Sequence, residues 1–489
     1  MPKVAPVIVA AVPIPDDLNA DQLLDYGKQI LYGLLDKQIR VVSYACDGTE
    51  VERSVQRLFV KIADRVIRHV IKNPREGCPD TEVVIGVFRG QPVVMVQDSK
   101  HGLKTFRNNL FSGARLLTLA SYTAIYRRIQ ELAYEDGTPL YHRDVHKLDR
   151  QDDNAAARLF SAATIEFLIK HHPDYLGEII YLFIFGELID AYQNRAIAHQ
   201  ERIKLVLRAR YFMDYWQAYL QSAGYSEMQY FLSREATDIA RYIIDGLIGL
   251  VVVYRDHLDG TLPLLPWLHS SETCEHVFGE ARQIVKDFTM LDFFYMLTKL
   301  RVKLYEAVLR GNSSDFKARA NGYNHTYLDT KGIDTQILAT FPTNDDIQDA
   351  AQQAMEECES LVALLGLDPS MLQDTLARQT QLPAIDSWYT SADDSIYSSD
   401  DDESDGQHDD DSDSDMEENA DDATELQEIM DDIEQDKYRF SSTQEEELTR
   451  LSCAAVAITS DEMAKMYVVI FLVFRYCLVM TQNPSFLVP

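Results

Sequence analysis

Two short apolar runs, each followed directly by an aspartate, constrain the fold of this chain most. Residues 41–46 (VVSYAC) lead into Asp47 and Gly48, and residues 91–97 (QPVVMVQ) lead into Asp98. Runs of this length and composition predict buried strands. A helical pattern separates them, so we expect a parallel pair with a right-handed crossover. Asp47 and Asp98 would then lie at one edge of a sheet. The alternative for Asp47 is a turn residue, since Asp-Gly is a common turn pair.

The segments around these runs extend the α/β pattern. A strand is expected over residues 6–12 and a helix over residues 17–38, both before the first run. A second helix is expected over residues 51–71, followed by a Pro/Gly loop at residues 73–80. This second helix would carry a basic stripe, for which a solvated face is a better explanation than a DNA contact: Arg57, Lys61, Arg65 and Arg68.

The central part of the chain has a different composition. Residues 120–262 are helical in pattern and rich in aromatic side chains. Aromatic stripes at helical spacing are usually core residues, so we expect an all-α domain inserted into the α/β unit. Neither standard phosphate-binding motif, G-x-x-x-x-G-K-[ST] or a strand-linked G-x-G-x-x-G, occurs in the chain. The sequence therefore offers no standard phosphate cradle.

Residues 270–282 (SSETCEHVFGEAR) predict a further helix with two glutamates in its first turn. Ser270 or Ser271 can cap this helix, and Glu272 and Glu275 share one face because they are three residues apart. Acidic residues also favour the first turn of any helix through its dipole. Carboxylates at the ends of neighbouring strands, joined by a glutamate on a later helix, are the ligands that two-metal phosphoryl transfer requires.

The negative charge of the chain is concentrated in one segment. The formal charge is −32, and residues 393–436 contain 22 Asp and Glu and no Lys or Arg, which leaves −10 for the remainder. We expect this low-complexity segment to be disordered and to recruit basic partners such as histones. The six cysteines form no C-x-x-C pair, so neither a zinc ribbon nor a disulfide framework is expected.

No membrane association is expected from the sequence. The N-terminus lacks the basic and apolar regions of a secretory signal peptide. Residues 466–480 are apolar, but they include Arg475 and fall short of the roughly 20 residues that a membrane span needs. A packed helix or strand is expected there.

The motifs, taken in order, resemble those of the P-element transposases and their THAP-domain relatives. The resemblance covers roughly residues 6–300. It implies a partial α/β RNase H-like core, interrupted by a large all-α insertion, from a family that cuts and joins DNA with Mg²⁺ held by an Asp, Asp, Glu triad. The matching segments are Cys46-Asp47-Gly48-Thr49, Asp98-x-x-His101-x-x-Lys104-x-x-Arg107-Asn108, the helical insertion, and residues 270–278.

The resemblance assigns roles to individual residues. Asp47 takes the place of the second catalytic aspartate and Glu275 that of the catalytic glutamate, so both would be metal ligands. Glu272, Asp98 and His101 would support them. DNA is the implied partner and the nucleus the implied location, and self-association is open. The candidate DNA-binding residues are Lys100, Lys104, Arg107, Asn108 and Arg115.

The chain departs from the family pattern in two places. It begins at what should be the third strand of an RNase H-like core, so the strand with the first aspartate is expected to be missing. The zinc-binding THAP module has no counterpart in the Cys and His spacing. We therefore expect a truncated transposase that is inactive, because two of three ligands cannot hold the metal pair. A domesticated DNA- or protein-binding scaffold is the alternative, and an all-α scaffold with carboxylates as surface caps is a third possibility.

Six segments describe the expected organisation, in which helices dominate. One helix is expected at residues 344–365, with Gly366 as its stop. The segments are the partial core (1–119), the all-α insertion (120–262), the region of the glutamate helix (263–310), a helical region (311–389), the disordered acidic linker (390–437) and a short segment with the apolar tail (438–489).

Overall fold

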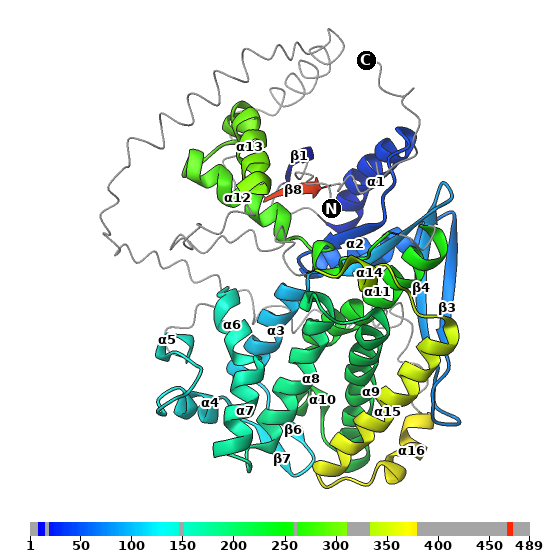
Figure 1. The fold of residues 1–489 in the computed structure, drawn as a ribbon, viewed down its shortest axis with the longest axis vertical. Coiled ribbons are helices and arrows are strands. Elements are labelled where there is room, and N and C mark those ends of the chain that lie inside the picture. Colours follow the sequence, from blue (N-terminus) through cyan, green and yellow to red (C-terminus); the bar gives the residue numbers. More distant parts are fainter. Residues whose placement is uncertain are drawn as a thin grey trace. The chain divides into compact units, whose positions relative to one another are not determined.

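The computed structural model describes residues 8–14, 19–145, 151–258, 262–310, 333–378 and 467–472. Helices dominate these ranges (Figure 1). The strands are β1 (Ile8–Ile14), β2 (Ser43–Cys46), β3 (Arg65–Ile71), β4 (Thr81–Phe88), β5 (Gln91–Gln97), β6 (Leu117–Leu119), β7 (Tyr122–Ala124) and β8 (Tyr467–Leu472). The helices of the N-terminal half are α1 (Ala20–Asp36), α2 (Glu50–Lys61), α3 (Ser99–Phe111), α4 (Tyr126–Leu132), α5 (His142–Val145), α6 (Asp153–Leu159), α7 (Ala162–His171) and α8 (Leu176–Gln193). The later helices are α9 (His199–Ala223), α10 (Glu227–Tyr230), α11 (Arg234–His257), η1 (Pro266–Leu268), α12 (Glu272–Ile284), α13 (Met290–Arg310), α14 (Thr335–Leu338), α15 (Asn344–Leu364) and α16 (Pro369–Arg378).

The central sheet contains four strands in the order β2-β5-β4-β3. β2 and β5 are parallel, and Cys46 lies beside Gln97 at their carboxyl ends. The predicted parallel pair is therefore confirmed. β3, β4 and β5 form an antiparallel meander, which makes the sheet mixed.

The helix expected over residues 51–71 is wrong in its second half. α2 ends at Lys61, and the following segment forms β3, which pairs with β4 along its whole length. Four of the seven β3 residues are β-branched, and such side chains favour a pleated surface when a partner strand is present. β4, for which no strand was expected, supplies that partner. The basic stripe is accordingly split between α2 and β3.

The strand expected at residues 6–12 lies outside the central sheet. β1 pairs with β8 in a separate two-stranded sheet. β8 falls within the apolar segment 466–480, for which a helix or a strand was expected, and it is a strand over its described residues. Among the described residues, no helix combines the length and the apolar character needed to cross a membrane.

Helices cover both faces of the central sheet. α1 and α2 pack on one face through a cluster that includes Leu23, Val55 and Phe59. α11 packs on the other face, and α8, α9 and α15 continue the same core. α15 runs along α9 (Figure 1). Several aromatic residues of the segment 120–262 are buried core residues, as expected: Tyr181, Phe185, Tyr211, Phe212 and Trp216. The segment shares its core with the sheet.

Two glycines allow α11 to lie close to β5. A Cβ atom at Gly246 would be 3.2 Å from the main-chain oxygen of Met95, and one at Gly249 would be 3.0 Å from Cγ1 of Val94. Both distances are tighter than ordinary van der Waals contact. The spacing of three residues puts both glycines on the helix face toward the sheet.

The helix expected over residues 344–365 is confirmed by α15. Thr343 and Asp346 form a capping box at its start, and Gly366 follows its end with a φ of +83°. The expected acidic linker, residues 390–437, lies outside the described residues.

Candidate functional site

The parallel pairing of β2 and β5 brings Asp47 and Asp98 to the same sheet edge. Each aspartate directly follows the last residue of its strand, and these last residues, Cys46 and Gln97, are partners in the register. The main-chain N–H of Asp98 donates to the carbonyl of Cys46 at 3.0 Å, so the pairing extends to the aspartates. The prediction that both carboxylates lie at one edge is confirmed.

The turn after Asp47 requires a glycine. Gly48 has a φ of +97°, and a Cβ atom there would lie 2.3 Å from Oε1 of the buried Gln97. The Gly48 N–H donates to Glu52 at 3.2 Å, and Thr49 caps α2. Asp47 is therefore followed by a turn that the hydrogen bond to Glu52 and the Thr49 cap stabilise. This turn is compatible with a further role for Asp47.

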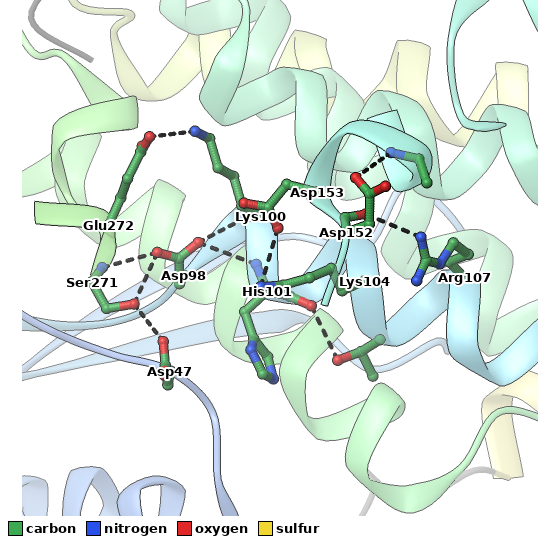
Figure 2. Close-up of polar contacts among 12 residues, drawn as sticks. Asp47, Asp98, Lys100, His101, Lys104, Arg107, Asp152, Asp153, Ser271 and Glu272 are labelled. Carbon is green, nitrogen blue, oxygen red and sulfur yellow. Dashed lines mark hydrogen bonds and ion pairs between the residues drawn. The ribbon is translucent and has the colours of Figure 1, made fainter. Parts of the chain in front are cut away.

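Ser271 connects the two aspartates. Its hydroxyl contacts Oδ1 of Asp47 at 2.6 Å and Oδ2 of Asp98 at 3.0 Å, and its main-chain N–H donates to the same Oδ2 of Asp98 at 2.9 Å (Figure 2). The hydroxyl has one proton, so it donates to one carboxylate at a time. Sequence reasoning considered Ser271 only as a helix cap and missed this bridge.

Asp98 also caps α3. Its Oδ1 accepts the main-chain N–H groups of Lys100 at 2.7 Å and of His101 at 3.2 Å. Both of its oxygens are thus engaged, and the residue is only 2 % exposed. Asp98 joins β5, α3 and the start of α12 in one set of hydrogen bonds.

Glu275 lies one helical turn after Ser271 in α12 and is half-buried. Burial raises the pKa of its carboxyl to about 8, and the nearby carboxylates of Asp98 and Asp47 act in the same direction. The ammonium of Lys104 opposes this shift. The raised pKa favours the neutral form of Glu275, because burial and the nearby negative charges both disfavour the carboxylate.

Lys104 is the cation whose charge opposes the raised pKa of Glu275. Its ammonium lies 3.1 Å from Oδ1 of Asp153 at the start of α6. Burial alone would lower the pKa of Lys104, but the carboxylates of Asp153, Glu275 and Asp98 outweigh burial and raise it. Sequence reasoning missed Asp153, which no motif distinguishes from other surface aspartates.

Glu272 points to a different partner. Its carboxylate forms an ion pair with Lys100 (Figure 2). His276 lies 4.0 Å from the same carboxylate, one turn further along α12. Burial raises the pKa of Glu272, and Lys100 acts against that rise. Glu272 therefore holds the start of α12 to α3.

The candidate DNA-binding residues are paired, hydrogen-bonded or partly buried within the fold. Lys100 is paired with Glu272 and Lys104 with Asp153. The remaining three are placed as follows: Arg107 is 1 % exposed and donates to the carbonyl of Asp152, Asn108 is half-buried, and Arg115 donates to the carbonyl of Met228. A DNA contact by this set stays a prediction.

The carboxylates, as arranged, do not form a ligand set for Mg²⁺. Mg²⁺ demands near-octahedral oxygen ligands at close range. Asp98 gives both oxygens to N–H and O–H groups. Nowhere in the described ranges are three acidic, His or Cys side chains grouped so that they could hold a metal ion. The site can instead link three segments through hydrogen bonds.

His269 is a half-buried histidine that no sequence pattern indicated. Its Nδ1 lies 2.7 Å from the hydroxyl of Ser43 in β2, and its Nε2 lies 3.2 Å from the hydroxyl of Tyr254 in α11. Burial lowers its pKa to about 4, so the ring is neutral at physiological pH. The two contacts hold the segment before α12 against the sheet and α11.

Comparison with known proteins gives one distant structural similarity. No protein-family model and no curated protein matches the chain. Among solved structures, the Drosophila P element transposase strand transfer complex matches with a TM-score of 0.40 and 14 % sequence identity, over 63 % of this chain and 76 % of that chain. At that TM-score the similarity does not show a shared fold.

Proposed function

We propose that this chain is a transposase-derived protein of the P-element type that does not cleave DNA. Support comes from motifs that follow one another as in that family, and from the convergence of the strand ends and α12. In this proposal β2, β5 and the helices between them are the remains of an RNase H-like core. Asp47 and Glu275 then descend from catalytic residues.

The hydrogen bonds of Ser271 carry the proposal that cleavage is lost. In a two-metal site the carboxylate oxygens face the ions. Here the hydroxyl of Ser271 lies between Asp47 and Asp98, and the main-chain N–H groups of Lys100 and His101 donate to the other oxygen of Asp98. These residues now tie β2, β5, α3 and α12 together.

A plasmid-nicking assay tests the proposal without knowledge of a target sequence. The full chain is incubated with supercoiled DNA and Mg²⁺ or Mn²⁺, beside the variants Asp47→Ala, Glu275→Gln and the exposed control Asp25→Ala. We expect the same background level of nicking from all four proteins. Metal-dependent nicking by the unaltered chain that disappears in Asp47→Ala and Glu275→Gln, but not in Asp25→Ala, would overturn the proposal.

A binding role is the second candidate, in which the fold serves DNA or protein contacts and the acidic segment recruits basic partners. It is favoured by exposed cations on the helical hairpin that follows the site, which have no ion-pair partner in the part of the chain that the structure describes. If it holds, the plasmid assay still shows no nicking, whereas direct binding measurements give a signal.

A further inference from the structure

The hairpin of α12 and α13 exposes four cations that have no partner among the described residues. Arg282 and Lys286 lie at the end of α12 and just after it, and Lys299 and Arg301 lie on α13. None of the four forms a hydrogen bond or an ion pair with any described residue of the chain. In a protein with a strongly negative formal charge, such a group is a local positive surface.

The acidic residues of the hairpin do not neutralise this surface. Glu280 is paired with Lys303 at 3.1 Å, and Asp292 accepts hydrogen bonds from Thr289 at the start of α13. Asp287 is the remaining acidic residue between residues 276 and 304, and it is exposed. The four cations therefore outnumber the available carboxylates on the hairpin surface.

The outer face of α13 is apolar although it is exposed. Leu291 is 54 % and Tyr295 77 % exposed, and they lie four residues apart on one stripe. The inner face of α13 is fully buried against α12, so the helix is apolar on both sides: Phe293, Met296, Leu300 and Leu304 pack with Val277 and Ala281. A helix that is apolar on both sides needs a partner on its outer face.

Helical geometry places the two α13 cations on either side of that outer face. At 100° per residue, Lys299 is about 40° from Tyr295 on one flank, and Arg301 is about 120° from it on the other. The exposed apolar side chains of Leu291 and Tyr295, with cations on both sides, match a groove whose two edges are negative. The major groove of B-DNA has this character and is wide enough to admit one helix.

We propose that the α12–α13 hairpin is a docking surface for duplex DNA. The cations contact phosphates on both rims, and Leu291 and Tyr295 face the groove between them. A second copy of this chain fits less well, since two such faces would bring like charges together. The inference rests on the second candidate function, a binding role, and deepens it by naming the surface and its partner; it needs neither cleavage nor the carboxylate site.

The test measures how DNA binding depends on salt. Fluorescence anisotropy with a labelled 20-base-pair duplex is recorded at several salt concentrations for the full chain, for Lys299→Gln/Arg301→Gln, and for Lys28→Gln/Lys37→Gln. Lys28 and Lys37 are exposed on and after α1 and serve as the control with the same charge change. Removing two phosphate contacts should reduce the slope of log K against log salt by about 2, and the control should leave it unchanged.

Further variants and probes separate the surface from its alternatives. Tyr295→Ala should weaken DNA binding at least 5-fold with an unchanged salt slope, because it removes no charge. Equal slopes for the hairpin variant and the control would overturn the proposal. So would equally tight binding of a poly-aspartate peptide or of anionic vesicles, or a dimer in sedimentation that Tyr295→Ala dissociates. Nicking in the plasmid assay would contradict only the proposed function.

Discussion

Asp47 and Asp98 occupy equivalent positions after neighbouring strands, yet the fold uses them differently. Asp98 accepts three main-chain hydrogen bonds, two at the N-terminus of α3 and one from Ser271, and it shares the Ser271 hydroxyl with Asp47. Asp47 accepts one, from the hydroxyl of Ser271, and its charge contributes to the raised pKa of Glu275. Mutating each aspartate separately therefore tests whether Asp98 stabilises the fold more than Asp47 does.

We predict that Asp98→Ala lowers the free energy of unfolding by about 3 kcal/mol. The loss combines a helix cap with a buried N–H group left without an acceptor. Asp47→Ala should change it by less than about 1 kcal/mol, because Ser271 can still donate to Asp98 and one repulsive charge disappears. Urea denaturation of both variants measures the difference. Equal losses would mean that the two carboxylates have the same structural role.

The elements around the site depend on how closely α11 approaches β5. Gly246 and Gly249 carry no side chain where the helix meets the strand, so the main chains come close. Gly33 in α1 has nothing within 4 Å of a Cβ position and an ordinary helical φ. Gly246 and Gly33 thus share a helical conformation but differ in how closely other atoms surround them.

We expect Gly246→Val to lower the free energy of unfolding by more than about 2 kcal/mol, since the strand backbone cannot move away from the added atoms. Gly33→Val, the matched control, should stay within about 0.5 kcal/mol because valine and glycine have similar helix propensities. Thermal melts followed by circular dichroism give both values. A neutral Gly246→Val would show that α11 has room to shift on the sheet.

At the scale of the whole molecule, a buried histidine links stability to pH. His199 is 1 % exposed, its Nε2 donates to the carbonyl of Leu338, and its ring stacks on Phe341 at 5.0 Å. Burial lowers its pKa from 6.5 to about 4. Between these two values the unfolded chain binds a proton that the folded chain does not. Stability therefore falls as the pH decreases through this window.

We predict that the free energy of unfolding falls by up to about 3 kcal/mol between pH 7 and pH 4 through this group. His199→Gln should reduce that pH dependence, and His142→Gln, at an exposed position, should leave it unchanged. Urea titrations at pH 7, 6, 5 and 4 provide the comparison. If the slope with pH is the same in all three proteins, His199 is not the group responsible.

Local sequence patterns predicted the parts of this fold that depend on neighbouring residues. The apolar runs before Asp47 and Asp98 form the parallel pair, and the helix of Glu272 and Glu275 begins beside Ser271. Several aromatic residues of the segment 120–262 are buried, as their spacing predicted: Tyr181, Phe185, Tyr211, Phe212 and Trp216. Each of these features follows from hydrophobic periodicity and capping within a few residues.

The predictions that went wrong concern segments whose pattern suits two structures. The run from Arg65 to Ile71 has helical spacing of its basic residues and a high content of β-branched residues. Only the pairing with β4 makes it a strand. The ion pairs of two basic residues after Asp98 could not be seen in the sequence either, because their partners Glu272 and Asp153 are distant along the chain; a DNA contact by these residues stays a prediction.

The sequence alone thus determined where the strands end in carboxylates and where the glutamate helix begins, because those features arise from local propensity and periodicity. Only the tertiary structure decided what the carboxylates do. Ser271 lies 224 residues from Asp47 and 173 from Asp98, and its hydrogen bonds exist only once α12 has docked at the sheet edge. Hydrogen bonds and burial depend on neighbours in space, and no local pattern encodes those neighbours.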